Sequence, residues 1–306
     1  MAKPAAKKNA AKKSAAKKSA KKTTEKIETY VAKADQKVAL AVAGATASAF
    51  TITVRFLSGL TQTQKNAFKK AADRWTRMIV GDLPPVRVDG EVIDDILILA
   101  QGTPIDGPGG ILGQAGPTHL RPASAGAAAF LPAKGIMSFD TADLKKMEQN
   151  GTLNDVITHE MGHVLGIGTV WGFKSLLKGA GTSNPTFVGP AAMAEYGTLR
   201  GSGPKPVPVE NTGGGGTRDS HWRENIFRNE LMSGFIAGPN NPLSRMTVGS
   251  LKDLGYVVDL NAAEPYTLPN LLMLAESGAL TAHTAPIDDG IMLPNIPTVL
   301  PGDSLQ

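Results

Sequence analysis

Alternation between apolar and polar positions marks the first clear element of the chain. In the stretch FTITVRF, residues 50–56, aromatic and β-branched side chains occupy every second position, which predicts a strand. Residues 61–80 change to the period of a helix, because their apolar side chains fall on one face. We expect Trp75 on this face to anchor the core. The face is formed by Ala67, Phe68, Ala71, Ala72, Trp75, Met78 and Ile79.

Further strands are expected on both sides of a loop rich in glycine and proline. Residues 85–88 and 92–99 favour short strands before the loop, which has the sequence GTPIDGPGGILGQAGP. The stretch GIMSFD, residues 135–140, favours another strand after it. A sheet accompanied by two or three helices predicts an α+β fold.

Composition narrows the chemistry that this fold can perform. The chain has no cysteine, which excludes disulfides, thiolate ligands and a cysteine nucleophile. Any metal therefore has to be held by His, Asp or Glu. No apolar run is long enough to predict a transmembrane helix.

Positive charge is concentrated at the N-terminus. Residues 1–37 hold 12 lysines and 3 acidic residues, a net charge of +9, which leaves −4 on residues 38–306 from the total of +5. The lysine pairs follow neither a helical nor a strand period, so we expect a disordered Lys/Ala-rich tail. Two interpretations stay open: the tail binds nucleic acid or another anionic surface, or it is a solvated segment that aids solubility.

Residues 38–49 form a short apolar segment that ends in A-x-A-like alanines. It has some features of a cleaved secretory signal, but Glu25, Glu28 and Asp35 precede it and its apolar part is short. We therefore favour a linker into the first strand. Secretion by a non-standard route and a cytoplasmic location stay open.

The stretch TLNDVITHEMGHVLG, residues 152–166, contains candidate metal chemistry. It predicts a helix that ends at Gly166, where the chain can turn back sharply. His159 and His163 lie one helical turn apart, so both imidazoles can reach one ion. Glu160 projects beside them as a candidate general base rather than as a ligand.

A catalytic zinc normally has three protein ligands, so a third one is needed. It has to come from beyond the helix, because a later residue on the same face would lie too far along the axis. Short-spaced metzincins place a histidine three residues after the glycine, where this chain has Thr169. Three histidines remain, His119, His221 and His283.

Several separated motifs, taken in order, resemble one family. These are the H-E-x-x-H-x-x-G helix, a long insertion over 172–218, SHW at 220–222 and NELM at 229–232. They resemble the leishmanolysin-type zinc metalloendopeptidases of the metzincin clan. Residues 244–259 are similar to the helix and strand that follow in that family, and the resemblance spans residues 50–266.

The resemblance implies a metzincin-type zinc peptidase domain: a twisted mixed sheet, an active-site helix, a Met-turn and a C-terminal helical subdomain. It implies one catalytic Zn²⁺ and assigns Glu160 as general base and Met232 as the Met-turn residue. The implied zinc ligands are His159, His163 and His221. His119 and His283 match no family ligand and are expected at the surface.

The expected activity is hydrolysis of internal peptide bonds in proteins. Zinc-bound water would attack the scissile carbonyl, while Glu160 takes its proton and returns it to the leaving amine. By the same resemblance, residues 135–140 are expected to be the edge strand with which an extended substrate pairs. Latency through a cysteine is excluded, because the chain has none.

A second metal site is suggested by a similarity to the structural calcium loop of matrixins. Two alternatives stay open, a calcium site with hard oxygen ligands and a simple Gly/Pro turn. The candidate ligands are Asp106, Gly107, Gly109, Asp140 and Asp143. Gln114 stands where matrixins have a zinc-binding histidine, which argues against a structural zinc.

The sequence thus divides into a tail (1–37), a linker (38–49), a peptidase domain (50–266) and a Pro-rich extension (267–306). Two rival functions remain, a zinc-binding adhesion or interaction module and a nucleic-acid-associated protein that acts through its tail. An intact Glu160 argues against the first. The oligomeric state is not readable from the sequence.

Overall fold

The computed structural model describes residues 1, 27–44, 48–107, 109, 112–214, 216–236, 238–270, 291–292 and 296–306. The predicted basic tail falls mainly on residues 2–26, which lie outside the described residues, as do His283 and much of the predicted C-terminal extension. In the part of the chain that is described, every helix is too short or too polar to cross a membrane.

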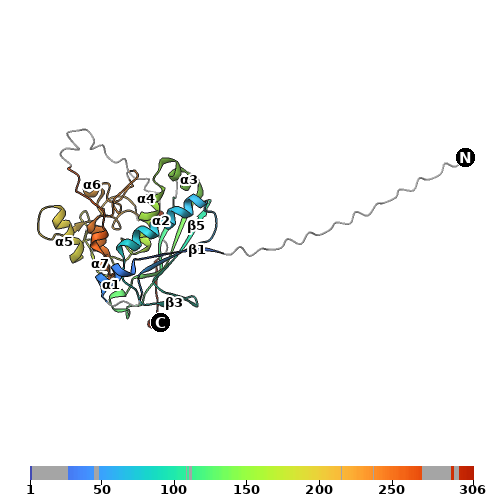
Figure 1. Ribbon diagram of the computed structural model, residues 1–306. Coiled ribbons are helices and arrows are strands. Elements are labelled where there is room, and N and C mark those ends of the chain that lie inside the picture. Colours follow the sequence, from blue (N-terminus) through green and yellow to red (C-terminus); the bar gives the residue numbers. More distant parts are fainter. Residues whose placement is uncertain are drawn as a thin grey trace.

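A seven-stranded mixed sheet organises the molecule (Figure 1). Its order is β1-β2-β5-β7-β6-β11, and β12 also pairs with β6. The pairs β1–β2 and β6–β7 are antiparallel and the others are parallel. The strands are β1 (Glu28–Lys33), β2 (Thr51–Phe56), β5 (Ile96–Thr103), β6 (Gly113–Leu120), β7 (Pro132–Asp140), β11 (Ile291–Met292) and β12 (Thr298–Val299).

Two helices cover one face of this sheet and form the main core with it. Helix α2 (Gln62–Met78) packs on β1 and β2, whereas α4 (Leu153–Val164) packs on β6 and β7, and the two helices contact each other. The predicted apolar face of α2 is confirmed, because all seven of its side chains are buried. Thr61 starts the helix through a capping box with Gln64, which satisfies its first backbone donors.

The opposite face of the sheet is closed by a smaller cluster that includes the C-terminus. Side chains alternate between the faces of a strand, so Leu97 on β5 points away from the main core. It packs with the hairpin of β3 (Val86–Val88) and β4 (Glu91–Ile93) and with Leu300 and Leu305. The chain end is held there by the Gln306 amide, which donates to the Pro85 carbonyl at 3.0 Å.

Beyond the sheet, the second half of the chain forms a group of short elements around α5 and α7, which pack together (Figure 1). Three short strands form a separate small sheet there in the order β10-β9-β8. The elements are β8 (Leu177–Lys178), β9 (Thr186–Phe187), α5 (Pro190–Leu199), β10 (Val207–Pro208), α6 (Glu224–Phe227) and α7 (Arg245–Leu254). The remaining helices are α1 (Gln36–Ala43) and α3 (Thr141–Asn150), and 3-10 turns lie at Gly126–Ala128, Leu260–Ala262 and Gly302–Ser304.

The expectation that residues 135–140 form the sheet edge is wrong. They lie in β7, which pairs with β5 on one side and β6 on the other. In the sheet order, β7 is followed by β6, and β6 by the two-residue strand β11. Strand β6 falls largely within the stretch expected to be a Gly/Pro loop. Its outer side is shared with the C-terminal segment, because β11 pairs at Gly113–Gln114 and β12 at His119–Leu120.

The boundaries expected at the N-terminus are also wrong. Residues 28–33, placed in the basic tail, form β1 and pair with β2 over its whole length. Residues 38–43, placed in a linker, belong to α1, whose first turn is capped by the Asp35 carboxylate. The sheet therefore starts more than twenty residues before the strand at 51–56.

We predict that Gly135→Ala destabilises the fold by about 1–3 kcal/mol through overpacking between α4 and β7. A Cβ at this position would lie 2.4 Å from Cγ1 of Val164 and 2.9 Å from the Gly116 carbonyl oxygen. Urea unfolding measures the change, with Gly172→Ala as the control, because a Cβ there meets nothing within 4 Å. Equal free energies of unfolding for the two variants would contradict this packing.

Candidate metal centre

Helix α4 supplies two of the candidate ligands. His159 and His163 are 5% and 2% exposed and project from one side of the helix, as their spacing predicts. The helix is fixed from behind by α2, where the Trp75 indole donates to the Thr158 carbonyl at 2.9 Å. The two rings are therefore held on a rigid element.

The third histidine reaches them because two glycines follow the helix. Gly166 and Gly168 both adopt positive φ angles, 109° and 75°, and turn the chain back. A Cβ on Gly168 would lie 2.1 Å from the Ser220 carbonyl oxygen, so only glycine permits this approach. His221 follows Ser220 directly and is 6% exposed.

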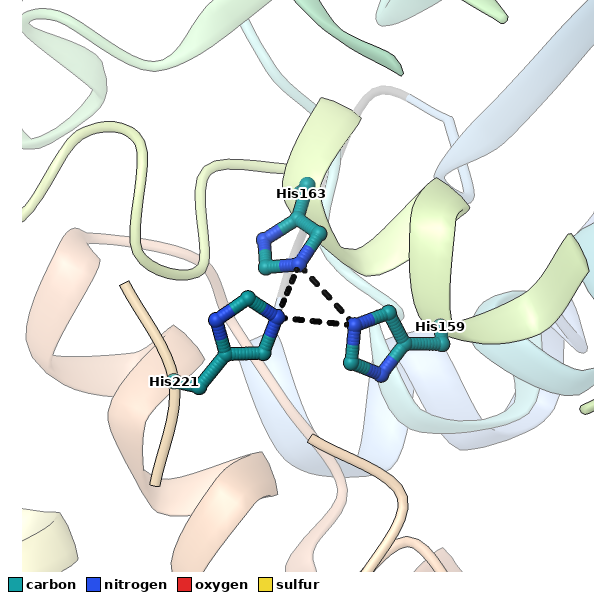
Figure 2. Close-up of side chains that lie close together, drawn as sticks. All are labelled: His159, His163 and His221. Carbon is teal, nitrogen blue, oxygen red and sulfur yellow. Dashed lines mark hydrogen bonds between the residues drawn. The ribbon is translucent and has the colours of Figure 1, made fainter. Parts of the chain in front are cut away.

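The three imidazoles converge on one point (Figure 2). The Nε2 atoms of His159 and His221 are 3.0 Å apart, those of His163 and His221 also 3.0 Å, and those of His159 and His163 3.1 Å. These nitrogens, from residues up to 62 positions apart in sequence, thus form a nearly equilateral triangle.

Each ring also has a backbone carbonyl beside its other nitrogen. The Nδ1 atoms lie 2.6 Å from the Leu231 oxygen for His159, 2.8 Å from the Ile167 oxygen for His163 and 2.9 Å from the Thr217 oxygen for His221. A carbonyl can only accept, so each Nδ1 is the protonated nitrogen and each Nε2 presents a lone pair. Burial, then the neighbouring histidine, lowers the pKa of each ring to about 3, which keeps the rings neutral.

Three converging lone pairs cannot hydrogen-bond to one another, so the geometry fits a bound cation. Zinc–nitrogen bonds of about 2.0–2.1 Å in a tetrahedral site need nitrogens about 3.3 Å apart, a few tenths of an ångström more than here. Catalytic zinc sites often have three histidine ligands and leave the fourth coordination position open. The carbonyl behind each ring is the partner that normally fixes a metal-bound histidine.

Glu160 lies beside the triangle without belonging to it. Its Oε1 is 4.0 Å from Nε2 of His159, and its Oε2 is buried with no hydrogen-bond partner among the described residues. Burial raises the pKa of Glu160 to about 8. A buried carboxyl with one free oxygen can accept or donate a proton at neutral pH.

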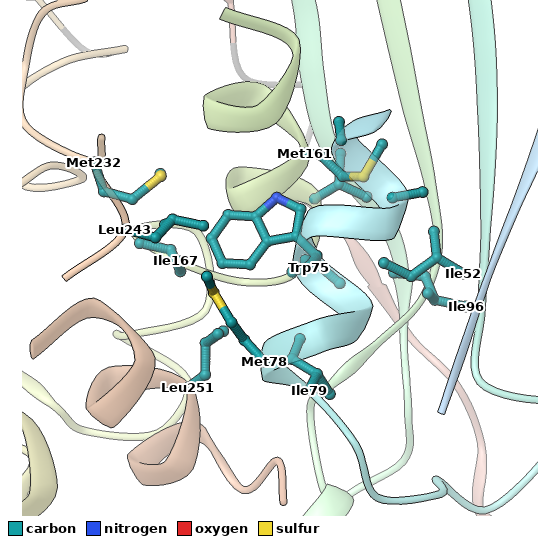
Figure 3. Close-up of a cluster of buried hydrophobic side chains, with 14 of the residues drawn as sticks. Ile52, Trp75, Met78, Ile79, Ile96, Met161, Ile167, Met232, Leu243 and Leu251 are labelled. Carbon is teal, nitrogen blue, oxygen red and sulfur yellow. The ribbon is translucent and has the colours of Figure 1, made fainter. Parts of the chain in front are cut away.

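Met232 packs against helix α4, which holds His159 and His163, and lies near Trp75 (Figure 3). It is completely buried, and a Cβ on Gly162 would lie 2.8 Å from its sulfur and 3.0 Å from the Trp75 ring. The absence of a side chain at Gly162 thus gives the thioether its position.

The calcium prediction finds no support. The Asp140 carboxylate accepts from the amides of Ile105, Ala142 and Asp143, and so acts as the cap of α3. The Asp143 carboxylate accepts from the Gly109 amide at 2.9 Å. Among the described residues, neither aspartate joins a group of three metal-binding side chains, and neither does Asp106. Gly107 and Gly109 both have positive φ angles, as expected for a tight turn.

Comparison with known proteins assigns the chain to a family. The family model for leishmanolysin matches residues 95–273, more than half of the chain, and this segment contains all three histidines. The chain belongs to the leishmanolysin family. It is accordingly a metallopeptidase of a zinc-dependent family that acts on proteins. A search of curated proteins returned no match.

Two features of this leishmanolysin-family site were not expected from the sequence. One is Gly168, whose role becomes visible only when Ser220 lies against it; the pattern Gly166-x-Gly168 was its only sequence signal. The other is the set of carbonyls behind the rings, which have no sequence signal at all. His119 lies on β6, outside the cluster.

We predict that His221→Ala abolishes stoichiometric zinc binding at neutral pH. Removing a ligand should weaken affinity by more than the roughly 10–100-fold of an outer-shell change. Zinc content after dialysis measures this, with His119→Ala as the control, since His119 contacts Thr118 rather than the cluster. Equal zinc content in both variants would exclude His221 as a ligand.

Proposed function

We propose that this leishmanolysin-family protein is an endopeptidase whose zinc is held by His159, His163 and His221. One observation supports this above the others: three neutral imidazoles present their Nε2 lone pairs to a single point. The family supplies the metal dependence, and the ligand assignment is our own. The comparisons give the rival functions, an adhesion module and a tail-driven nucleic-acid-associated protein, no support.

Zinc, when bound, supplies a Lewis acid that polarises a carbonyl and acidifies water. Glu160 accepts the proton of the attacking water in our mechanism and delivers it to the leaving amine. Its Oε2, which has no hydrogen-bond partner among the described residues, is a free acceptor for that proton. A nearby dication also favours the ionised form, against the effect of burial.

Met232 has a packing role in this proposal, as the Met-turn residue beneath the ligands. Its sulfur lies in an apolar setting between Gly162 and Trp75. A soft, unbranched side chain fills such an irregular gap without bringing a polar group near the metal. The C-terminal helical subdomain implied by the family would correspond to the group of elements around α5 and α7.

We further propose that substrate binds as an extended strand along the outer edge of β6. Between its pairings with β11 at 113–114 and with β12 at 119–120, β6 has no strand partner on its outer side among the described residues, and such a segment offers backbone groups to an incoming chain. Helix α4, which holds the histidines, packs beneath β6. The C-terminal strands β11 and β12 use parts of the same edge. Substrate therefore has to share the edge with them or displace them.

Glu160→Gln is expected to lower kcat by at least about 10²–10⁴-fold, the usual contribution of a general base, while zinc content stays at the wild-type value. The substrate is an unfolded peptide with acetylated and amidated ends, whose internal cleavage is detected by mass spectrometry. Glu148→Gln is a matched control, because Glu148 lies on α3 and contacts Gln64. Full activity of Glu160→Gln would remove the proposed base, and fragments only from peptides with free ends would indicate an exopeptidase.

The double variant Leu300→Asp/Leu305→Asp should lower KM for extended peptides several-fold and leave kcat unchanged. Its C-terminus loses apolar burial of about 1.5–3 kcal/mol per leucine at most, so the β6 edge is free in a larger fraction of molecules. Steady-state kinetics measure the effect, with Val92→Asp as the control, because Val92 is 49% exposed near the same cluster. An unchanged KM in a folded double variant would mean that substrate does not use this edge.

A further inference from the structure

A buried carboxylate next to the metal centre plays no part in the mechanism above. Glu230 is completely buried, and within the described residues it has no salt bridge to a lysine, arginine or histidine. Burying a carboxylate is costly unless hydrogen bonds compensate for the lost water. Its partners therefore indicate what it holds in place.

The two oxygens of Glu230 join two separate segments. Oε2 accepts from the Met232 amide at 2.7 Å, within the turn that contains Leu231 and Met232. Oε1 accepts from the Ser244 amide at 3.0 Å, from the Ser244 hydroxyl at 2.7 Å and from the Thr247 hydroxyl. Ser244 is the N-cap of α7, where the positive end of the helix dipole favours a negative charge. Burial raises the pKa of Glu230, whereas its four donors and the lack of an acceptor favour the ionised carboxylate.

The turn held by Oε2 orients one of the ligands. The Leu231 carbonyl lies between Glu230 and Met232 and accepts the Nδ1 proton of His159 at 2.6 Å. This bond sets both the tautomer and the plane of the imidazole. A shift of the turn would therefore move the lone pair of His159.

The helix end held by Oε1 is linked to a second ligand. The Thr247 hydroxyl, which donates to Glu230, accepts from the Trp222 indole at 2.8 Å. The Trp222 amide in turn donates to the Met232 carbonyl at 2.9 Å. Both the indole and the amide of Trp222 are therefore bonded to residues that Glu230 also contacts, Thr247 and Met232. Trp222 follows His221 directly in the chain. His163 is outside the network, because its partner is the Ile167 carbonyl.

We propose that Glu230 is a positioning residue, whose carboxylate sets the orientation of His159 and His221 but not of His163. This inference rests on the proposed function, in which the three histidines are the zinc ligands. It extends that function by naming the group that fixes the approach of two ligands from different parts of the chain.

A purely structural role for Glu230 makes a different prediction, and the chain offers a matched control. Asp253 also accepts from two amides at a helix start, those of Ala191 and Ala192 at 2.9 Å each, and it lies in the same part of the fold. No described bond connects it to a histidine. Asp253→Asn should therefore cost stability and leave the metal centre unchanged.

The experiment compares Glu230→Gln with Asp253→Asn in the full-length protein. Glutamine keeps the shape, but its amide nitrogen must face at least one donor, either the Met232 amide or the Ser244 group. Three quantities are measured: the zinc dissociation constant by chelator competition, the visible absorption of the cobalt-substituted protein, and the thermal midpoint of the metal-free protein. Cobalt absorption reports ligand geometry in the folded protein, which a loss of stability alone does not alter.

We expect Glu230→Gln to weaken zinc binding by about 10–100-fold and to change the cobalt spectrum, as for other groups behind metal ligands. Asp253→Asn should keep the wild-type values of both. A Glu230→Gln protein with a lower thermal midpoint but wild-type zinc affinity and spectrum would overturn the proposal.

A second variant keeps the test decisive if Glu230→Gln does not fold. Thr247→Val removes the hydroxyl between Trp222 and Glu230 at nearly constant shape, and it should change the cobalt spectrum in the same direction by a smaller amount. A wild-type spectrum for Thr247→Val would overturn the proposal. If the wild-type protein itself binds neither zinc nor cobalt, the ligand assignment fails and the role of Glu230 falls with it.

Discussion

The structure of this protein depends on one electrostatic requirement: three buried imidazoles have to stay neutral and present the same nitrogen to one point. Each ring meets this requirement by donating a hydrogen bond from its Nδ1–H to a backbone carbonyl, that of Leu231, Ile167 or Thr217. Those carbonyls belong to three different loops, so the position of each loop affects the geometry of the proposed metal centre. Burial then reinforces the arrangement, because it disfavours a charged ring.

The histidine cluster also requires other segments to approach the region of helix α4 closely, and glycine permits this at three positions. Gly135 lets α4 lie directly on β7, Gly162 makes room for the Met232 sulfur, and Gly168 admits the Ser220 carbonyl. In each case a Cβ would meet another atom at less than 3 Å. Helix α4 and the turn after it therefore make close contacts at these three positions, and a larger residue at any of them would force the neighbouring segments apart. The positions of the three histidines in this site therefore depend on the close packing around the helix.

The sequence predicts local elements well and their neighbours in space poorly. The helical face of α2 follows from periodicity, and the His159–Glu160–His163 helix from its start and stop signals and its motif; both were placed correctly. Strand β6 was missed because GQAGPTHL has no run of β-branched residues, and its pairing with β7 and the C-terminus is non-local. The expectation that β7 is the edge strand was wrong for the same reason, because the residues of a strand do not indicate its position in the sheet. His221 could be chosen over His119 and His283 only through a family resemblance, because no local period connects it to the helix.

The long interval between His163 and His221 raises the question of how a distant ligand can be held firmly. Closing a longer loop costs little additional entropy, about 0.6 kcal/mol per doubling of its length. The larger requirement is to fix the returning segment, and the interval supplies its own core for this purpose. Trp171 stacks on Trp222 with ring centres 4.8 Å apart, and Phe187 from β9 meets both rings at 5.0 and 5.6 Å. Val209 and Ser233 then bracket Trp222 through backbone bridges on its two sides. Trp222, the residue next to His221, is consequently the centre of an aromatic cluster, which holds this histidine on a loop as firmly as α4 holds the other two.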